Sequence, residues 1–151
     1  MGVEYREVIA HDIPQLAKIR AAEWESEVYW IRRIAGYLNR ELHPQLALMP
    51  RVLYVATDSG IIVGFVAGHL TQRFDCDGEL EWINVLPSYR RRGIARELVK
   101  LLAHWFIHNN AKKICVDGSG PFYEKLGATQ LNKHWMIWND IGQVFSVSAD
   151  G

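Results

Sequence analysis

The feature that most constrains this chain is the segment from Val85 to Arg96, which reads VLPSYRRRGIAR. An apolar, strand-like run ends at Pro87, three arginines and a glycine follow, and an amphipathic helical pattern begins near Gly93. Cations at the start of a helix are unfavourable, because the helix dipole already places roughly +0.5 charge there. The unpaired N–H groups of such a turn, with arginines around them, suit a phosphate or pyrophosphate. The sequence therefore predicts a strand–turn–helix unit that holds an anion.

Composition indicates a soluble globular protein. The chain has 151 residues, 49% of them hydrophobic and 23% charged, with 17 basic and 17 acidic side chains. This balance argues against nucleic acid as a partner, and no apolar run approaches the roughly 20 residues of a membrane span. The first residues do not resemble a signal peptide, and Cys76 and Cys115 lack metal or redox spacing, so we expect a cytoplasmic protein. We expect one domain over residues 1–141 and a loosely ordered tail over 142–151.

Hydrophobic periodicity predicts an α/β (α+β) fold. Strand patterns cover residues 5–9, 51–57, 61–68, 79–85, 113–116 and 133–139, and helical patterns cover 12–20, 29–48 and 93–109, with a short helical piece ending at Gly127. The turn Asp58-Ser59-Gly60 joins two of the strands as a hairpin. The order predicts a mixed, mostly antiparallel sheet flanked by helices.

Two motifs together resemble the GNAT (Gcn5-related) N-acetyltransferase superfamily. The run from Arg90 to Ala95 matches its pyrophosphate motif, and the run from Pro121 to Ala128, PFYEKLGA, matches its second signature except that Ala128 replaces an aromatic residue. The resemblance extends from about residue 3 to residue 138 and implies acetyl-coenzyme A as the co-substrate. Many members carry an asparagine before the tyrosine, where this chain has Asp117-Gly118-Ser119-Gly120.

The resemblance also implies the residues that bind the coenzyme. The pyrophosphate would lie on the basic turn, the pantetheine arm along the preceding strand, and Ser119 would replace the usual asparagine. The implied set is Ile83, Val85, Arg90, Arg91, Arg92, Gly93, Ile94, Ala95, Arg96 and Ser119.

Acetyl transfer from a thioester to an amine needs a base for the amine and an acid for the departing thiolate. Tyr123 occupies the family's acid position, although positioning the thioester is its alternative role. Glu79 and Glu81 share one face of a strand and are the candidate bases, with solvation or binding of a cationic substrate as their alternative roles. Ile83 and Val85 continue that face unless a bulge intervenes.

The segment from Glu23 to Trp30 is the candidate acceptor surface. In the family it overhangs the acceptor pocket, so Trp24, Tyr29 and Trp30 are candidate substrate contacts, with core packing as the alternative. Cys115 lies in an apolar run and is interpreted as a core thiol rather than a nucleophile. We expect no metal.

The resulting hypothesis is an N-acetyltransferase that moves acetyl directly to an amine on a small molecule or a peptide N-terminus. The alternative is a catalytically silent module that binds coenzyme A as a sensor or regulator. A nucleotide-dependent enzyme is disfavoured, because neither a P-loop nor a dinucleotide fingerprint occurs. The resemblance also allows a homodimer, although the sequence indicates no interface.

Overall fold

Seven strands form one mixed sheet, in the order β1-β2-β3-β4-β5-β7-β6, in the computed structural model, which describes residues 2–147. Every neighbouring pair is antiparallel except β4 and β5, which are parallel. This confirms the predicted mixed, mostly antiparallel sheet. The strands are β1 (Glu4–Glu7), β2 (Ala47–Asp58), β3 (Ile61–Thr71), β4 (Gly78–Val85), β5 (Ile114–Asp117), β6 (Thr129–Gln130) and β7 (Trp135–Trp138).

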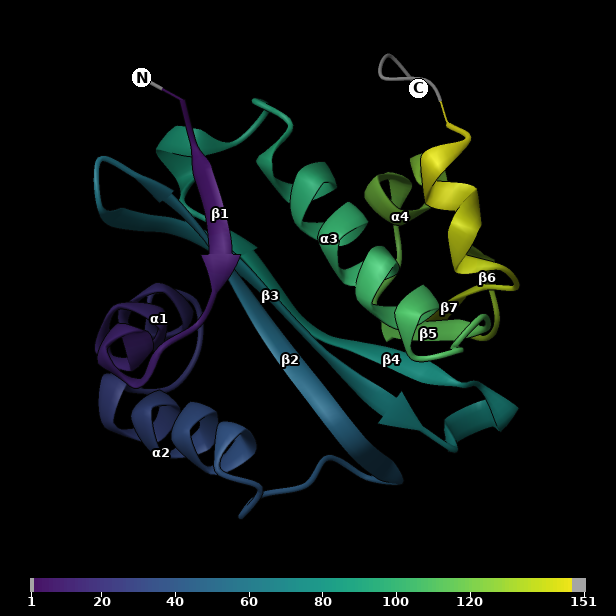
Figure 1. Cartoon of the computed structure of the whole chain (residues 1–151), viewed down its shortest axis with the longest axis horizontal. Helices are drawn as coiled ribbons and strands as arrows, with labels where there is room; N and C mark the ends of the chain where they lie inside the picture. The colour runs from purple at the N-terminus through teal and green to yellow at the C-terminus, as the bar shows by residue number, and fades with distance from the viewer. Residues whose placement is uncertain (1, 148–151) are drawn as a thin grey trace.

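Helices cover both faces of the sheet. Helices α1 (Ile13–Ala21) and α2 (Glu27–Leu38) lie on one face, whereas α3 (Ile94–His108), α4 (Pro121–Lys125) and the 3-10 helix η4 (Ile141–Phe145) lie on the other (Figure 1). Each face has its own apolar core, because the long helices turn an apolar stripe toward the strands. None of the helices within residues 2–147 combines the length and the apolar content that crossing a bilayer requires.

The sheet opens at its centre. Strands β4 and β5 pair only from Gly78 to Leu80 on β4 and from Ile114 to Val116 on β5. Beyond Leu80 the edge of β4 has no strand on the β5 side, so its peptide groups are available to a ligand. The two strands are joined by α3, which places the basic turn at the open end of this gap.

A β-bulge at Glu81 changes which residues of β4 share a face. Leu80 is opposite Gly68 and Trp82 is opposite Ala67, so Glu81 is the extra residue of the bulge. Leu80 packs in the core under α3, whereas Trp82 packs under α1 and α2. Ile83 and Val85 pack against the α3 core, so they do not continue the face of Glu79 and Glu81.

Two elements differ from the sequence prediction. The second helix ends at Leu38 rather than continuing to residue 48, because Arg40 takes a left-handed conformation with φ of 63° and the N–H of Leu42 bonds back to the carbonyl of Gly36. The expected loose tail is packed at its start: η4 buries Val144, which is 0% exposed, against the core that contains α3. Residues 148–151 of that tail lie outside the described residues.

Gly78 of β4 lies against Phe106 of α3 and Ile114 of β5. A Cβ at this position would lie 2.8 Å from Cδ1 of Phe106 and 2.9 Å from Cδ1 of Ile114. We expect Gly78→Val to lower the free energy of unfolding by about 2–4 kcal/mol, because the overpacked strand cannot move without opening the β4–β5 pairing. Chemical denaturation measures this. Gly2→Val is the control: at this exposed position no atom lies within 4 Å of an added Cβ and the backbone is not left-handed, so the stability should not change.

Candidate active site

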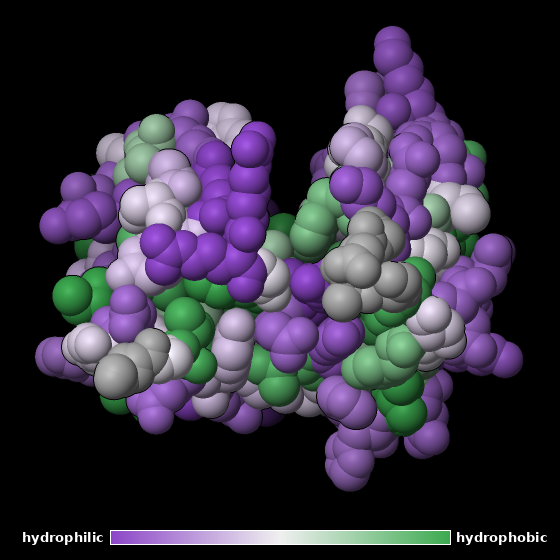
Figure 2. Space-filling model, turned by 90° about the horizontal axis from the view of Figure 1, so that it is seen from above, coloured by the Kyte–Doolittle hydropathy of each residue, from purple (hydrophilic) through white to green (hydrophobic). Residues whose placement is uncertain are grey.

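A cavity of about 730 Å³ occupies the open end of the gap beside β4. Its volume is in the range of small-molecule and cofactor sites. Seen from above, the surface is hollowed between two lobes, with a hydrophilic rim on the left and hydrophobic surface at the floor (Figure 2). Ile83 and Val85 line the cavity from β4, Phe122 and Lys125 from α4, and Glu23 from the segment after α1. The cavity therefore reaches both faces of the sheet through the gap.

The basic turn forms one wall of this cavity. Arg91 and Gly93 both have left-handed backbones, with φ of 65° and 81°. They turn the chain so that α3 begins at Ile94 with its first N–H groups unpaired within the helix. Among the predicted coenzyme residues, those that line the cavity are Ile83, Val85, Arg90, Arg91, Gly93, Ile94, Ala95 and Arg96. With Lys125, the wall holds four cations and suits an anionic ligand.

Two predicted coenzyme residues do not line the cavity. The guanidinium of Arg92 stacks on the ring of Tyr89, 4.8 Å from its centroid, and Ser119 is exposed in the loop after β5. Arg90 is engaged within the protein: its Nε donates to the carbonyl of Val85 at 2.9 Å, and its Nη2 lies 3.4 Å from Glu23. A ligand phosphate would compete with Glu23 for this guanidinium.

The acidic pair lies on the α1–α2 face of β4. Burial raises the pKa of Glu81 to about 7, and the negative charge of Glu79 and a hydrogen bond with it contribute further. The positive charge of Arg33 opposes this shift. A carboxyl group with a pKa near neutrality is suited to accept a proton at physiological pH. Glu79 is the more buried of the two and is held by an ion pair with Arg73 Nε at 3.2 Å.

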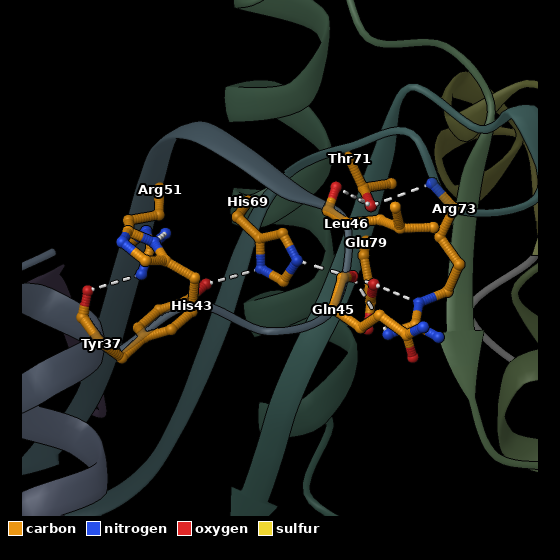
Figure 3. A network of polar contacts seen from close by, with 9 residues as sticks. All are labelled: Tyr37, His43, Gln45, Leu46, Arg51, His69, Thr71, Arg73 and Glu79. Carbon is orange, nitrogen blue, oxygen red and sulfur yellow. Dashed lines mark hydrogen bonds and ion pairs between the residues drawn. The ribbon is translucent and has the colours of Figure 1, made fainter. Parts of the chain in front are cut away.

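A buried polar network supports Glu79 from behind (Figure 3). The hydroxyl of Tyr37 lies 2.9 Å from Nδ1 of His69, and Nε2 of His69 lies 3.6 Å from Oε1 of Glu79. His69 is 0% exposed and Tyr37 is 1% exposed. Sequence reasoning missed this network, because its members come from α2, β3 and the loop before β4.

His69, Glu79 and Glu81 also resemble a metal donor set, since one atom from each lies within 4.8 Å of the others. The guanidinium of Arg73 already neutralises Glu79 at the oxygen nearest His69. Because a bound cation would meet this positive charge, we assign no metal to the cluster.

Tyr123 projects from α4 against Trp138, with ring centroids 5.9 Å apart. Its ring also lies close to Gly118, where a Cβ would be 3.1 Å from Cε2. Burial raises the pKa of Tyr123 to about 12, and the negative charge of Asp117 adds to the shift. With this pKa the phenol keeps its proton at neutral pH. Its hydroxyl has no hydrogen-bond partner within residues 2–147, and Tyr123 lies next to Phe122 of the cavity lining without lining the cavity itself.

A partly buried cation lies between two aromatic rings on the α1–α2 side of the sheet. The guanidinium of Arg20 lies 4.9 Å from the ring of Trp24 and 4.4 Å from that of Trp30, and it donates to Asn84 at 2.8 Å. Trp30 is only 6% exposed, so core packing rather than acceptor contact explains it. Trp24 and Tyr29 are 54% and 41% exposed and stay candidate acceptor contacts. Sequence reasoning did not single out Arg20.

The model of the acetyltransferase (GNAT) family matches residues 13–128. The chain belongs to the GNAT acetyltransferase family. Its match therefore covers α1 through the end of the second motif, including the basic turn and Tyr123.

Curated relatives are similar to part of the chain. The aminoglycoside N(6')-acetyltransferase type 1 of Salmonella typhimurium is 29% identical over 72 residues, which are 44% of this chain and 50% of the relative. The chain thus spans about half the length of the curated relatives it matches.

Solved structures share the fold. A GNAT family N-acetyltransferase from Escherichia coli in complex with CoA has a TM-score of 0.70 at 17% identity, covering 97% of this chain and 86% of that one. The structure of AAC(6')-Iy with the bisubstrate analogue CoA-S-monomethyl-acetylneamine has a TM-score of 0.71 at 18% identity, covering 88% of this chain and 95% of that one. At these identities the likeness supports the GNAT fold alone.

The two cysteines of this GNAT chain pack together, Cys76 from the segment just before β4 and Cys115 from β5. Cys76 and Cys115 are both buried, and Cys115 is 0% exposed. A hydrogen bond with Cys76 raises the pKa of the Cys115 thiol, and burial adds to the shift. The protonated thiol fits the core interpretation rather than a nucleophile.

Proposed function

We propose that this chain transfers an acetyl group from acetyl-coenzyme A directly to an amine, with Glu81 as the base and Tyr123 as the hydrogen-bond donor to the leaving sulfur. The observation that carries the proposal is the cavity that joins the two faces of β4. Its basic wall suits the diphosphate, and its far side opens at Glu23 and Asn84 toward the face that carries Glu81. The thioester and the amine would therefore meet in the gap between β4 and β5.

The reaction follows from these placements. The amine nitrogen attacks the thioester carbonyl carbon, and its proton passes to Glu81, directly or through water. Unpaired N–H groups on the open edge of β4 near Val85 would stabilise the oxyanion. The carbon–sulfur bond then breaks, and the thiolate accepts a hydrogen bond from the Tyr123 hydroxyl. The thiolate takes its proton from solvent as it leaves, and Glu81 returns the amine proton to solvent, so both side chains end in their starting states. Both substrates are bound at once, so no acetyl-enzyme forms.

The acceptor is proposed only as a class: an amine on a small molecule or a peptide N-terminus. The curated relatives are aminoglycoside acetyltransferases, and a structural neighbour is the NatC complex bound to Gag peptide and CoA. On this chain the carboxylates and the exposed rings of Trp24 and Tyr29 suit a protonated amine next to apolar surface.

The direct test is a screen of aminoglycosides, small amines and peptides, read out as free thiol released from acetyl-coenzyme A. We expect release above the acceptor-free rate with at least one class of amine. The alternative, a silent coenzyme A-binding module, predicts tight coenzyme binding by calorimetry and no acceptor-dependent thiol with any class.

Two adjacent arginines test the coenzyme site. We expect Arg91→Ala to weaken acetyl-coenzyme A binding about tenfold and to make it less sensitive to salt, because Arg91 lines the cavity. Arg92→Ala removes the same charge, but Arg92 stacks on Tyr89 outside the cavity, so the change should be under about twofold. Calorimetry at two salt concentrations measures both. Equal effects of the two variants would contradict the placement of the diphosphate beside Arg91 and away from Arg92.

A further inference from the structure

We propose that Tyr37 and His69 are positioning residues that hold Glu79 as the ionised partner of the acidic pair, so that the proton taken up during acetyl transfer resides on Glu81. The inference rests on the proposed function, in which Glu81 is the base. It assigns a role to the buried side chains that the reaction itself does not touch (Figure 3).

The first step is the fixed geometry of Tyr37 and His69. Tyr37 comes from α2 and His69 from β3, and their side chains meet at 2.9 Å where both are almost completely buried. The ring of Tyr37 also packs against that of Trp82, with centroids 4.9 Å apart. A hydroxyl and an imidazole buried in an apolar core are destabilising unless they are paired, so each fixes the orientation of the other.

The second step assigns the hydrogens. The pKa of Tyr37 is raised well above its ordinary value by burial and by the negative charge of Glu81, so the hydroxyl keeps its proton. It donates to Nδ1 of His69, which leaves the hydrogen of the neutral imidazole on Nε2. That nitrogen makes no conventional hydrogen bond within the described chain and points at Oε1 of Glu79, 3.6 Å away.

The third step concerns Glu79. Arg73 Nε donates a hydrogen bond to Oε1 of Glu79 at 3.2 Å, and the His69 N–H faces the same oxygen from 3.6 Å, beyond hydrogen-bond distance. The hydrogen bond from a guanidinium and the N–H dipole aimed at this oxygen both favour the ionised form. The proton shared by two neighbouring carboxyl groups then resides on the other one, which is Glu81. In this arrangement the negative charge of Glu79 raises the pKa of Glu81, and Glu79 does not itself accept the proton.

Other charged and titratable groups surround Glu79 and Glu81, but they do not face Oε1 of Glu79 as His69 does. They are Arg20 from α1, Arg33 from α2, Arg51 from β2, Cys76 from the segment before β4 and Cys115 from β5. Arg51 lies over the ring of Tyr37 at 4.6 Å, and Cys115 is opposite Glu79 in the sheet. In residues 2–147, only Arg73 and His69 approach Oε1 of Glu79 within 4 Å as donors.

The test follows the proton directly, by carbon NMR of glutamate side-chain carboxyl groups during a pH titration. Glu79→Gln and Glu81→Gln assign the two signals. In the wild type we expect the signal of Glu81 to carry most of the change near neutral pH. In His69→Leu the change should divide between both carboxyl groups, and the midpoint should move up by about half a pH unit, because a donor to the ionised pair is lost.

Two further variants separate positioning from packing. His69→Gln keeps an N–H donor of similar reach and should restore much of the wild-type pattern. Tyr37→Phe removes only the hydroxyl and should move the titration in the same direction as His69→Leu, but less. Tyr54→Phe removes a hydroxyl from a half-buried tyrosine of β2 and should change nothing.

Unchanged titration in both His69→Leu and Tyr37→Phe would overturn the inference. Because Tyr37→Phe is a small change, it serves where His69→Leu does not fold. The NMR readout needs no acceptor, so a failed amine screen would reject the proposed function without deciding this inference. Where an acceptor is found, the acidic limb of kcat/KM should move with the NMR midpoint.

Discussion

Glu81→Gln is expected to lower kcat/KM for amine acetylation by roughly 10²–10⁴-fold at about pH 8, because it removes the proton acceptor and keeps the shape of the side chain. The wild-type rate should rise with pH through about 7, since burial and the charge of Glu79 raise the pKa of Glu81 to that value and only the ionised form accepts a proton. The variant should lose this acidic limb. Steady-state rates over a range of pH measure both effects.

Folding should not be the cause of the loss. The folded chain binds the Glu81 proton more tightly than the unfolded chain, so this group contributes stability at low pH that declines as pH rises from about 4.5 to about 7. The neutral amide of Glu81→Gln avoids burying a charge, and the variant should be at least as stable as the wild type above pH 7. Thermal melting checks this.

Glu79→Gln is the matched control, since it makes the same change two residues away. Removing the neighbouring negative charge should lower the pKa of Glu81, so the acidic limb should move to lower pH while activity above neutrality is retained in large part. The reverse outcome, with Glu79→Gln inactive and Glu81→Gln active, would identify Glu79 as the base.

The basic wall of the cavity could be predicted because its signals are local. A proline that ends a strand, a glycine with positive φ and unpaired N–H groups at a helix start all lie within Val85 to Arg96. Likewise, the helical spacing of the apolar residues in α3 predicts which face of that helix is buried. Which arginines reach the cavity could not be predicted, because it depends on side-chain contacts such as that of Arg92 with Tyr89.

The acceptor side could be predicted only in part. The two-residue spacing placed Glu79 and Glu81 together, but the bulge at Glu81 that turns Ile83 to the α3 face has no sequence signal. Tyr37 and His69 meet across 32 positions of sequence through the packing of α2 on β3. His69 follows directly after the predicted strand 61–68, and its partners depend on tertiary structure.

Tyr123→Phe is expected to lower kcat by roughly 10²-fold while leaving the affinity for acetyl-coenzyme A unchanged. The variant keeps the ring contact with Trp138 and removes only the hydroxyl. The loss is placed at the lower end of acid catalysis because the pKa of Tyr123 is about 12, well above the ordinary thiol value of about 8.5. Complete proton transfer to the thiolate is therefore uphill, and the phenol acts mainly by hydrogen bonding to the developing negative charge on sulfur.

The same pKa gives this prediction a second readout. A donor that loses its proton only as pH rises through about 12 produces no alkaline limb below that pH, whereas an unperturbed tyrosine would produce one near 10. The wild-type profile should therefore stay flat between about pH 8 and 10 wherever the acceptor amine itself does not titrate. Thiol release measures the rate, and calorimetry measures the affinity for acetyl-coenzyme A. Tyr5→Phe is the matched control, since Tyr5 is a half-buried tyrosine of β1 that packs on the same core. A Tyr123→Phe variant with the wild-type kcat would contradict the prediction. Solvent would then stabilise the departing thiolate, and Tyr123 would be a packing residue.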